Sequence, residues 1–147
     1  MKPFIRPIVD ADFPAWLPMW TGYNTFYKRT LADEITRKTW ARFLDPAKPM
    51  HALVAEQDGA LLGLVHYLFH PATAMVEDNC YLADLFTNEK ARGKGVGRLL
   101  IEAVYDAARA AGCSRVYWQT NETNAVAQVL YNDVADRSGF IVYRRQL

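Results

Sequence analysis

The chain has 147 residues, of which 51% are hydrophobic and 22% are charged. This length and composition exclude a disordered chain and fit one compact domain over residues 1–147. The 17 Lys and Arg residues nearly balance the 16 Asp and Glu residues, which argues against a nucleic-acid-binding protein, because such proteins carry a large basic excess.

The first part of the chain predicts one strand followed by two helices. Residues 4–9 have the pattern of a short strand. Apolar and aromatic residues then recur at spacings of three and four after Asp12, which predicts an amphipathic helix with Asp12 as its N-cap. A second helix is expected over residues 31–44, where Asp45-Pro46 ends it.

A hairpin and a further strand follow. Residues 51–56 and 60–69 are strand-like runs joined by Asp58-Gly59, a strong hairpin signal. The second run is apolar on both faces, so we expect it at the centre of the sheet. The next strand is predicted over residues 79–87.

The last part of the chain alternates helices and strands. A helix is predicted from about residue 96 to 111, where Gly112 stops it, and a strand follows over residues 114–120. Another helix is predicted over residues 124–137 and a final strand over residues 139–145. The expected order is βααβββαβαβ, an α/β (α+β) fold with a mixed, mostly antiparallel six-stranded sheet and four helices.

Three glycines stand at every second position, with basic residues among them, between the strand at 79–87 and the helix that follows it. Glycine allows tight turns and close approach of a ligand to backbone N–H groups, and a helix N-terminus favours anions, so the loop suits a pyrophosphate. No stretch of the chain fits the P-loop pattern. The dinucleotide fingerprint fails as well, because Arg98 or Leu100 stands where its third glycine is needed.

Arg92-Gly93-Lys94-Gly95-Val96-Gly97 resembles the Q/R-x-x-G-x-G/A signature of the GNAT superfamily of N-acetyltransferases. Residues 81–87 resemble the strand that precedes this signature, and Asn124 to Tyr131 with Ser138-Gly139-Phe140 resembles the family's N-x-x-A-x-x-L-Y…GF segment. The likeness covers roughly residues 50–145. Within the superfamily, the sequence resembles the branch that includes yeast histone- and polyamine-type acetyltransferases.

The resemblance implies a GNAT fold that binds acetyl-CoA as co-substrate. The pyrophosphate would lie on the glycine loop, and the pantetheine arm would pair with the preceding strand. The residues that this implicates in cofactor binding are Leu85, Phe86, Thr87, Arg92, Gly93, Lys94, Gly95, Val96, Gly97, Arg98 and Asn124. Tyr131 is the expected general acid, since its position in the motif would bring the phenol close to the sulfur of the leaving thiolate.

The sequence leaves the general base open. Ala83 occupies the place where some polyamine-type relatives have a glutamate, and alanine cannot act as a base. Regular alternation along the strand puts Tyr81 and Ala83 on one face and Asp84 on the other, so we expect a structural role for Asp84 unless the strand is bulged. Three alternatives remain. The base acts through water, or the amine arrives already neutral, or the base is one of the carboxylates near the strand ends, which are Glu77, Asp78 and Glu122.

Helical spacing marks the aromatic residues of the first helix as mostly core, but the resemblance implies that the first helices and their loop cover the acceptor site. Tyr23, Tyr27 and Trp118 are the candidates for an aromatic wall suited to an aliphatic amine or a cation. His66 and His70 are about 13 Å apart along one strand and cannot chelate one metal ion, so no metal is expected.

The expected function is acetyl-CoA-dependent transfer of an acetyl group to a primary amine of a small molecule or protein, by direct attack in a ternary complex. A catalytically inactive CoA-binding sensor or interaction module is the alternative, and Ala83 is the residue that favours it. The chain has only two cysteines, Cys80 and Cys113, and no signal peptide, which predicts reduced thiols in a cytoplasmic protein. Neither a membrane nor a nucleic acid is expected as a partner. Only two residues follow the strand at 139–145, so the second arm of the family's usual C-terminal hairpin is missing, and a homodimer is expected to cover the exposed edge.

Overall fold

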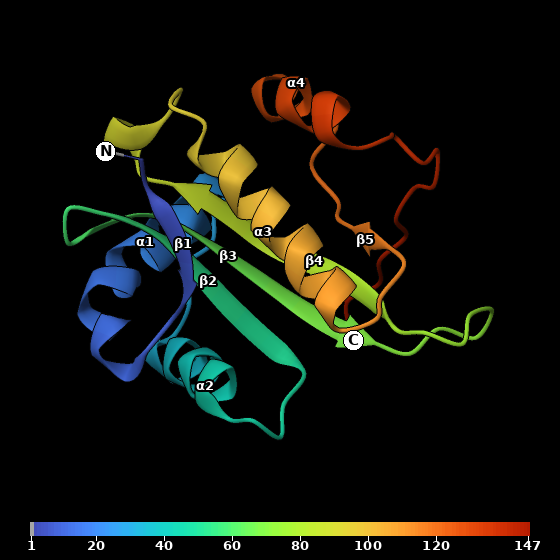
Figure 1. Ribbon diagram of the computed structural model, residues 1–147, viewed down its shortest axis with the longest axis horizontal. Coiled ribbons are helices and arrows are strands. Elements are labelled where there is room, and N and C mark those ends of the chain that lie inside the picture. The colour runs from blue at the N-terminus through green and yellow to red at the C-terminus, as the bar shows by residue number, and fades with distance from the viewer. Residues whose placement is uncertain (1) are drawn as a thin grey trace.

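A five-stranded sheet forms the centre of the computed structural model, which describes residues 2–147 (Figure 1). The strands lie in the order of the chain, with antiparallel pairing except for the parallel pair β4–β5. They are β1 (Phe4–Pro7), β2 (Met50–Gln57), β3 (Ala60–His70), β4 (Asn79–Thr87) and β5 (Val116–Tyr117). The sheet is therefore mixed and mostly antiparallel, with the doubly apolar β3 at its centre as predicted.

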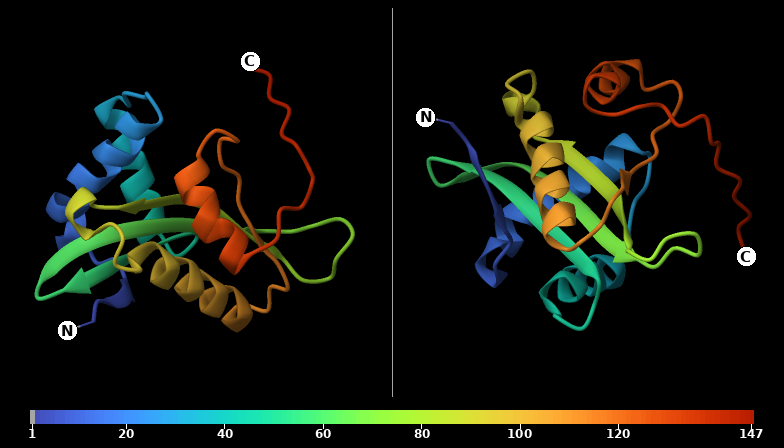
Figure 2. Two further views of the ribbon diagram at one scale, coloured as in Figure 1. Left: turned by 90° about the horizontal axis from the view of Figure 1, so that it is seen from above. Right: turned by 45° about the vertical axis from the view of Figure 1, so that its right-hand side comes forward.

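Helices cover both faces of the sheet (Figure 2). On one face lie α1 (Phe13–Phe26) and α2 (Asp33–Leu44), and on the other lies α3 (Val96–Ala110), whereas α4 (Ala125–Val134) follows β5 at the sheet's end. Short 3₁₀ helices precede α1 (η1, Asp10–Asp12) and α3 (η2, Glu89–Ala91). Within residues 2–147 no helix is long and apolar enough to cross a membrane.

Each face of the sheet has its own hydrophobic core. On the α3 face, Val65, Leu82 and Leu100 belong to one buried cluster. On the α1 and α2 face, Trp16, Leu64 and further aromatic side chains form a second cluster. The sheet thus separates a largely aliphatic core from an aromatic one, and the aromatic core lies under the predicted acceptor site.

The predicted sixth strand is not formed, so the expected six-stranded sheet is wrong in this respect. Residues 135–147 have no regular secondary structure and extend away from α4 (Figure 2). The strand expected over residues 114–120 is reduced to the two residues of β5, which pair with β4. Backbone N–H and C=O groups need a paired neighbour to form a strand. Such a short β5 offers residues 139–145 almost no edge, and the observed order ends with α4.

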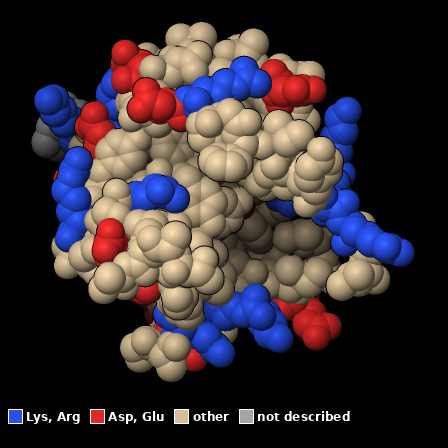
Figure 3. Space-filling view, turned by 90° about the vertical axis from the view of Figure 1, so that its right-hand side faces the viewer, with Lys and Arg blue, Asp and Glu red and all other residues tan. Residues whose placement is uncertain are grey.

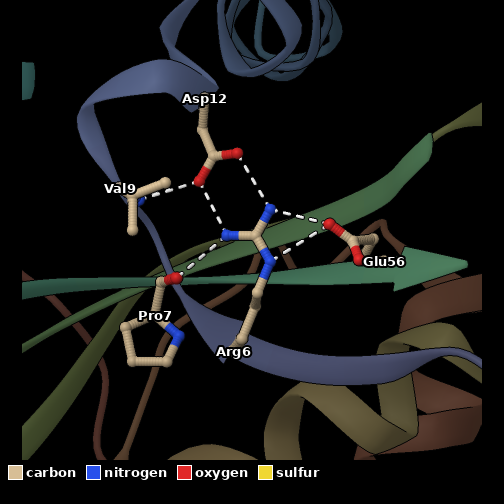
Figure 4. Close-up of polar contacts among 5 residues, drawn as sticks. All are labelled: Arg6, Pro7, Val9, Asp12 and Glu56. Atoms are coloured by element: carbon tan, nitrogen blue, oxygen red, sulfur yellow. Dashed lines mark hydrogen bonds and ion pairs between the residues drawn. The ribbon is translucent and has the colours of Figure 1, made fainter. Parts of the chain in front are cut away.

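A partly buried ion-pair network connects the N-terminal strand to the rest of the sheet (Figure 4). The Arg6 guanidinium donates to both oxygens of Asp12, at 2.8 and 2.9 Å, and to Oε1 of Glu56 at 2.9 Å. Asp12 also accepts a hydrogen bond from the backbone N–H of Val9 at 2.8 Å, and makes no side-chain cap of α1. The hydrogen bonds from Arg6 hold the pKa of Asp12 below its usual value.

Candidate active site

The parallel strands β4 and β5 diverge after two paired positions. Cys80 pairs with Val116 and Tyr81 with Tyr117, after which β4 continues to Thr87 while the other chain leaves the sheet toward α4. The second half of β4 therefore has no strand beside it on the β5 side. An unpaired strand edge presents backbone N–H and C=O groups to a ligand. This opening can accept an extended, amide-containing arm, and it contains the predicted cofactor residues Leu85, Phe86 and Thr87.

The glycine loop lies at the end of β4 and leads into the N-terminus of α3. Gly93 and Gly95 have positive φ angles of 76° and 82°, and Gly95 is the N-cap of α3. A Cβ atom at either position would meet nothing within 4 Å, so the backbone conformation and not packing requires glycine there. The first N–H groups of α3 have no partner within the helix, and they face the same exposed loop. The loop thus has the backbone geometry that a pyrophosphate site requires.

The basic side chains around the loop have different partners. Arg92 donates from Nε to the carbonyl oxygen of Thr87 at 3.1 Å, and its guanidinium carbon lies 5.5 Å from the Phe86 ring centroid. Arg98 forms an ion pair with Asp133 and so connects α3 to α4. Lys94 is exposed on the loop. Arg92 and Lys94 therefore border the anion site, whereas the guanidinium of Arg98 is held at the contact with α4.

Gly97 is the point at which α3 and α4 approach each other. A Cβ atom at this position would lie 3.4 Å from Cδ2 of Leu130 and 3.9 Å from Oγ1 of Thr87. A side chain on Gly97 would thus fill space between the two helices and the end of β4. These are ordinary van der Waals distances, so only a side chain larger than that of alanine would press on α4.

Helix α4 contributes Asn124 and Tyr131. Asn124 is the N-cap residue and donates from Nδ2 to Oγ1 of Thr120 at 3.3 Å. The Tyr131 ring packs edge-to-face on Trp118, with 5.4 Å between the ring centroids. Burial, with a smaller contribution from Tyr27, raises the pKa of Tyr131 to about 12. A phenol with this pKa stays protonated at neutral pH and can donate a proton.

A bulge in β4 changes the face on which Asp84 lies. His66 of β3 pairs with Asp84 and Tyr67 pairs with Leu82, so Ala83 has no partner on β3. The extra residue reverses the alternation, and the expectation that Asp84 faces away from Tyr81 is wrong. Asp84 instead accepts a hydrogen bond from Nδ1 of His66, at 2.9 Å, on the side of the sheet covered by α1.

Sequence reasoning missed His66 and Trp16 as partners of this carboxylate. Trp16 lies in α1 and donates from Nε1 to Nε2 of His66 at 3.0 Å. Trp16 is fully buried and His66 is 2% exposed, whereas the Asp84 side chain keeps 19% of its surface open. Helical spacing marks Trp16 as a core residue, but no spacing in the sequence predicts its partner on β3.

The residues predicted for the aromatic wall pack on α1 and against α4. The Tyr23 and Tyr27 ring centroids lie 5.0 Å apart on α1, and the Tyr23 hydroxyl is 3.5 Å from the carbonyl oxygen of Ala83. Trp118 instead packs on Tyr131 and, at 6.4 Å, on Tyr105. Figure 3 views the side of the molecule that carries β5 and shows a hollow there whose walls are mostly uncharged.

Two of the remaining polar candidates have side-chain partners. Oγ of Ser114 donates to Glu77 at 2.7 Å, and Nε2 of the half-buried His70 lies 2.7 Å from the Tyr117 hydroxyl. Burial raises the pKa of Cys80 to about 12, which fits an inert thiol and not a nucleophile. Among residues 2–147 there is no group of three or more His, Cys, Asp or Glu side chains that could hold a metal ion.

Comparisons with known proteins agree with this geometry. Residues 11–134 match the acetyltransferase (GNAT) family. The chain is 38% identical to the D-amino-acid N-acetyltransferase HPA3 of Saccharomyces cerevisiae over 143 residues, which cover 96% of this chain and 89% of the yeast protein. It is 28% identical to the N-acetyltransferase YhfO of Bacillus subtilis, over 95% of this chain and 94% of that protein.

A solved structure shares the fold at low sequence identity. The aminoglycoside N-acetyltransferase AAC(6')-Iy in complex with CoA has a TM-score of 0.84 and 17% identity, covering 98% of this chain and 94% of that chain. The predicted family is thereby confirmed, and the chain is an N-acetyltransferase of the GNAT family.

Proposed function

We propose that this protein transfers the acetyl group of acetyl-CoA to a primary amine of a small molecule, by direct attack in a ternary complex. The observation that carries the proposal is the open edge of β4, which leads directly into the glycine loop at the N-terminus of α3. This arrangement offers backbone pairing for an amide-containing arm and N–H groups for its pyrophosphate. The acceptor class follows the yeast relative, whose name gives D-amino acids as its substrates.

The cofactor would contact both ends of this opening. The N–H groups of residues 92–97 would bind the pyrophosphate, with Arg92 and Lys94 adding charge-assisted hydrogen bonds. Leu85, Phe86 and Thr87 would pair with the pantetheine arm, and Asn124 at the start of α4 would approach the same arm from the other side.

The transfer needs stabilisation of charge at two atoms. Backbone amides near Leu85 and Phe86 would stabilise the carbonyl oxygen as it becomes an oxyanion. Tyr131 would donate a proton to the leaving sulfur, and its raised pKa keeps the phenol protonated at neutral pH beforehand. Tyr23 and Tyr27 would line the acceptor side, and Trp118 would hold the ring of Tyr131.

We also propose a homodimer that works in the cytoplasm. Apolar side chains of the C-terminal tail are exposed: Phe140, Ile141, Val142 and Tyr143. Consecutive exposed apolar residues favour burial against another surface, and β5 has a neighbouring strand on one side only.

Cys80 and Cys113 are free thiols, which fits a reducing compartment. Sedimentation of Ile141→Asp beside Val76→Asp, a substitution on an exposed loop, tests the dimer, and dissociation is expected only for the former.

The enzymatic proposal is tested by thiol release from acetyl-CoA with a panel of D-amino acids, polyamines, aminoglycosides and basic peptides. We expect turnover with at least one small amine and a loss of about 10²-fold or more in kcat for Tyr131→Phe. CoA binding without turnover would favour the inactive CoA-binding module, the alternative that Ala83 favours because alanine cannot act as a base. Absence of CoA binding would overturn the proposal.

A further inference from the structure

Asp84 is a carboxylate on β4 for which the sequence predicted only a structural role. Asp84 lies on β4 directly after the bulge at Ala83, close to where the predicted cofactor arm would pair. It combines a fixed position with an open surface, because its partner His66 is buried while 19% of the Asp84 side chain is exposed. A carboxylate of this kind is available to a ligand.

Two hydrogen bonds fix the orientation of Asp84. The indole N–H of Trp16 can only donate, so Nε2 of His66 must accept and carries no proton. The proton of His66 is therefore on Nδ1, which donates to Oδ2 of Asp84 at 2.9 Å. These two hydrogen bonds do not involve the second carboxylate oxygen of Asp84.

Two tyrosines, Tyr23 and Tyr81, lie close enough to Asp84 for its charge to affect them. Burial, followed by the charge of Asp84 and a hydrogen bond to it, raises the pKa of Tyr23. Burial and the charge of Asp84 likewise raise the pKa of Tyr81. Both tyrosines also interact with Tyr27, and the guanidinium carbon of Arg29 lies over the Tyr23 and Tyr27 rings at 5.7 and 5.5 Å. A carboxylate with tyrosine side chains close to it can attract an ammonium group.

We propose that Asp84 binds the ammonium group of the acceptor and takes a proton from it, with His66 and Trp16 as positioning residues. The inference rests on the proposed function and names the acceptor class as a cationic primary amine. It also supplies the base that the alanine at position 83 removes, because the bulge brings the next residue to the acceptor face.

The protons of the transfer balance with these residues. The bound ammonium gives one proton to Asp84, and the neutral nitrogen then attacks the acetyl carbon. The C–N bond forms, the C–S bond breaks with its electron pair going to sulfur, and Tyr131 donates a proton to that sulfur. The second proton lost by nitrogen restores Tyr131, and the proton on Asp84 passes to solvent. The products are the N-acetylated amine, CoA as the free thiol, and one proton.

The test compares Asp84→Asn with wild type over a series of primary amines whose pKa values range from well above to well below neutral. Asparagine keeps an oxygen that can accept the His66 hydrogen bond but removes the charge. We expect kcat/KM to fall about 10²-fold or more for amines of high pKa, and the loss to shrink toward none for amines already neutral. Asp58→Asn, in the hairpin turn between β2 and β3, is the matched control and should behave as wild type.

Each remaining outcome is decisive. A loss in Asp84→Asn of equal size for all amines would show a structural role and overturn the proposal, and so would a change of less than twofold. CoA binding by the same variant checks its fold, and Asp84→Glu, which keeps the charge, should recover part of the activity if Asp84→Asn fails to fold. Inactivity of the wild-type protein with every amine would instead contradict the proposed function.

Discussion

Nε1 of Trp16 donates a hydrogen bond to Nε2 of His66 at 3.0 Å. This bond joins α1 to β3, the strand that pairs with β4 on the side away from its open edge. In Trp16→Phe this donor is lost, and Nδ1 of His66 is no longer obliged to donate to Asp84. We expect kcat/KM for the amine to fall while the KM for acetyl-CoA is unchanged, with stability reduced by about 1–3 kcal/mol. Steady-state kinetics and urea unfolding measure both.

Trp40→Phe is the control for this substitution. Trp40 is 7% exposed and its ring centroid lies 4.8 Å from that of Trp16, so it belongs to the same core. A comparable loss of stability is expected without the kinetic effect. If both variants lowered kcat/KM equally, general damage to the aromatic core would explain the result.

The Arg6–Asp12 pair should make stability depend on pH. The pKa of Asp12 is lowered in the folded state. Its contribution to folding stability is therefore complete above the pKa of the unfolded state, about 3.9, and is lost as the pH falls through the pKa of the folded state. We expect Asp12→Asn to reduce the free energy of unfolding by about 1–3 kcal/mol at pH 7 and by much less near pH 2. Urea unfolding at both pH values measures the difference.

Asp33→Asn disrupts a more exposed pair with Arg37 and serves as the comparison. It should have little effect at either pH, because exposed ion pairs contribute little. A loss for Asp12→Asn that is the same at pH 7 and pH 2 would show that packing, and not charge, is responsible.

Gly95→Ala separates backbone strain from ligand binding. The φ angle of Gly95 is 82°, so alanine there should cost about 1–2 kcal/mol and displace the N–H groups of the loop. Gly59→Ala is the control. Gly59 has a similar φ angle of 79° and no atom within 4 Å of the Cβ position, so alanine should cause similar backbone strain, but the residue lies in the β2–β3 hairpin. Both variants should lose similar stability by thermal unfolding, and only Gly95→Ala should weaken CoA binding by calorimetry. Equal CoA affinity in the two would argue against the loop as the anion site.

The thiol of Cys80 should be unreactive in the folded protein. Burial raises its pKa to about 12, so almost no thiolate is present at pH 8. A thiol-specific reagent should label Cys80 at a rate limited by unfolding, and rapidly once urea is added. Fast labelling of the native protein at this residue would contradict the buried position.

The sequence was sufficient for much of the fold and for the cofactor loop. Alternation and turn signals predicted β4 over residues 79–87, and capping signals predicted α3 close to its observed ends. The glycine loop was recognisable because positive φ angles restrict Gly93 and Gly95 to one residue type. These features depend on local chemistry, which neighbouring residues in the chain reveal.

The features that were missed depend on distant parts of the chain. The bulge at Ala83 is set by the register of β4 against β3, and it decides whether Asp84 faces α1. Residues 139–145 alternate as a strand does, yet in the structure they have no partner edge because β5 is only two residues long. Pairing across the sheet thus decided both cases, and local patterns do not contain it.

The central claim, that the opening between β4 and β5 binds acetyl-CoA, is tested most directly by amide NMR of the ¹⁵N-labelled protein titrated with CoA. We expect the largest shifts at Leu85–Thr87, at Gly93–Gly97 and at Asn124, with the hairpin at Asp58-Gly59 unchanged. Saturable binding with shifts confined to other surfaces, or no binding at millimolar CoA, would contradict the account.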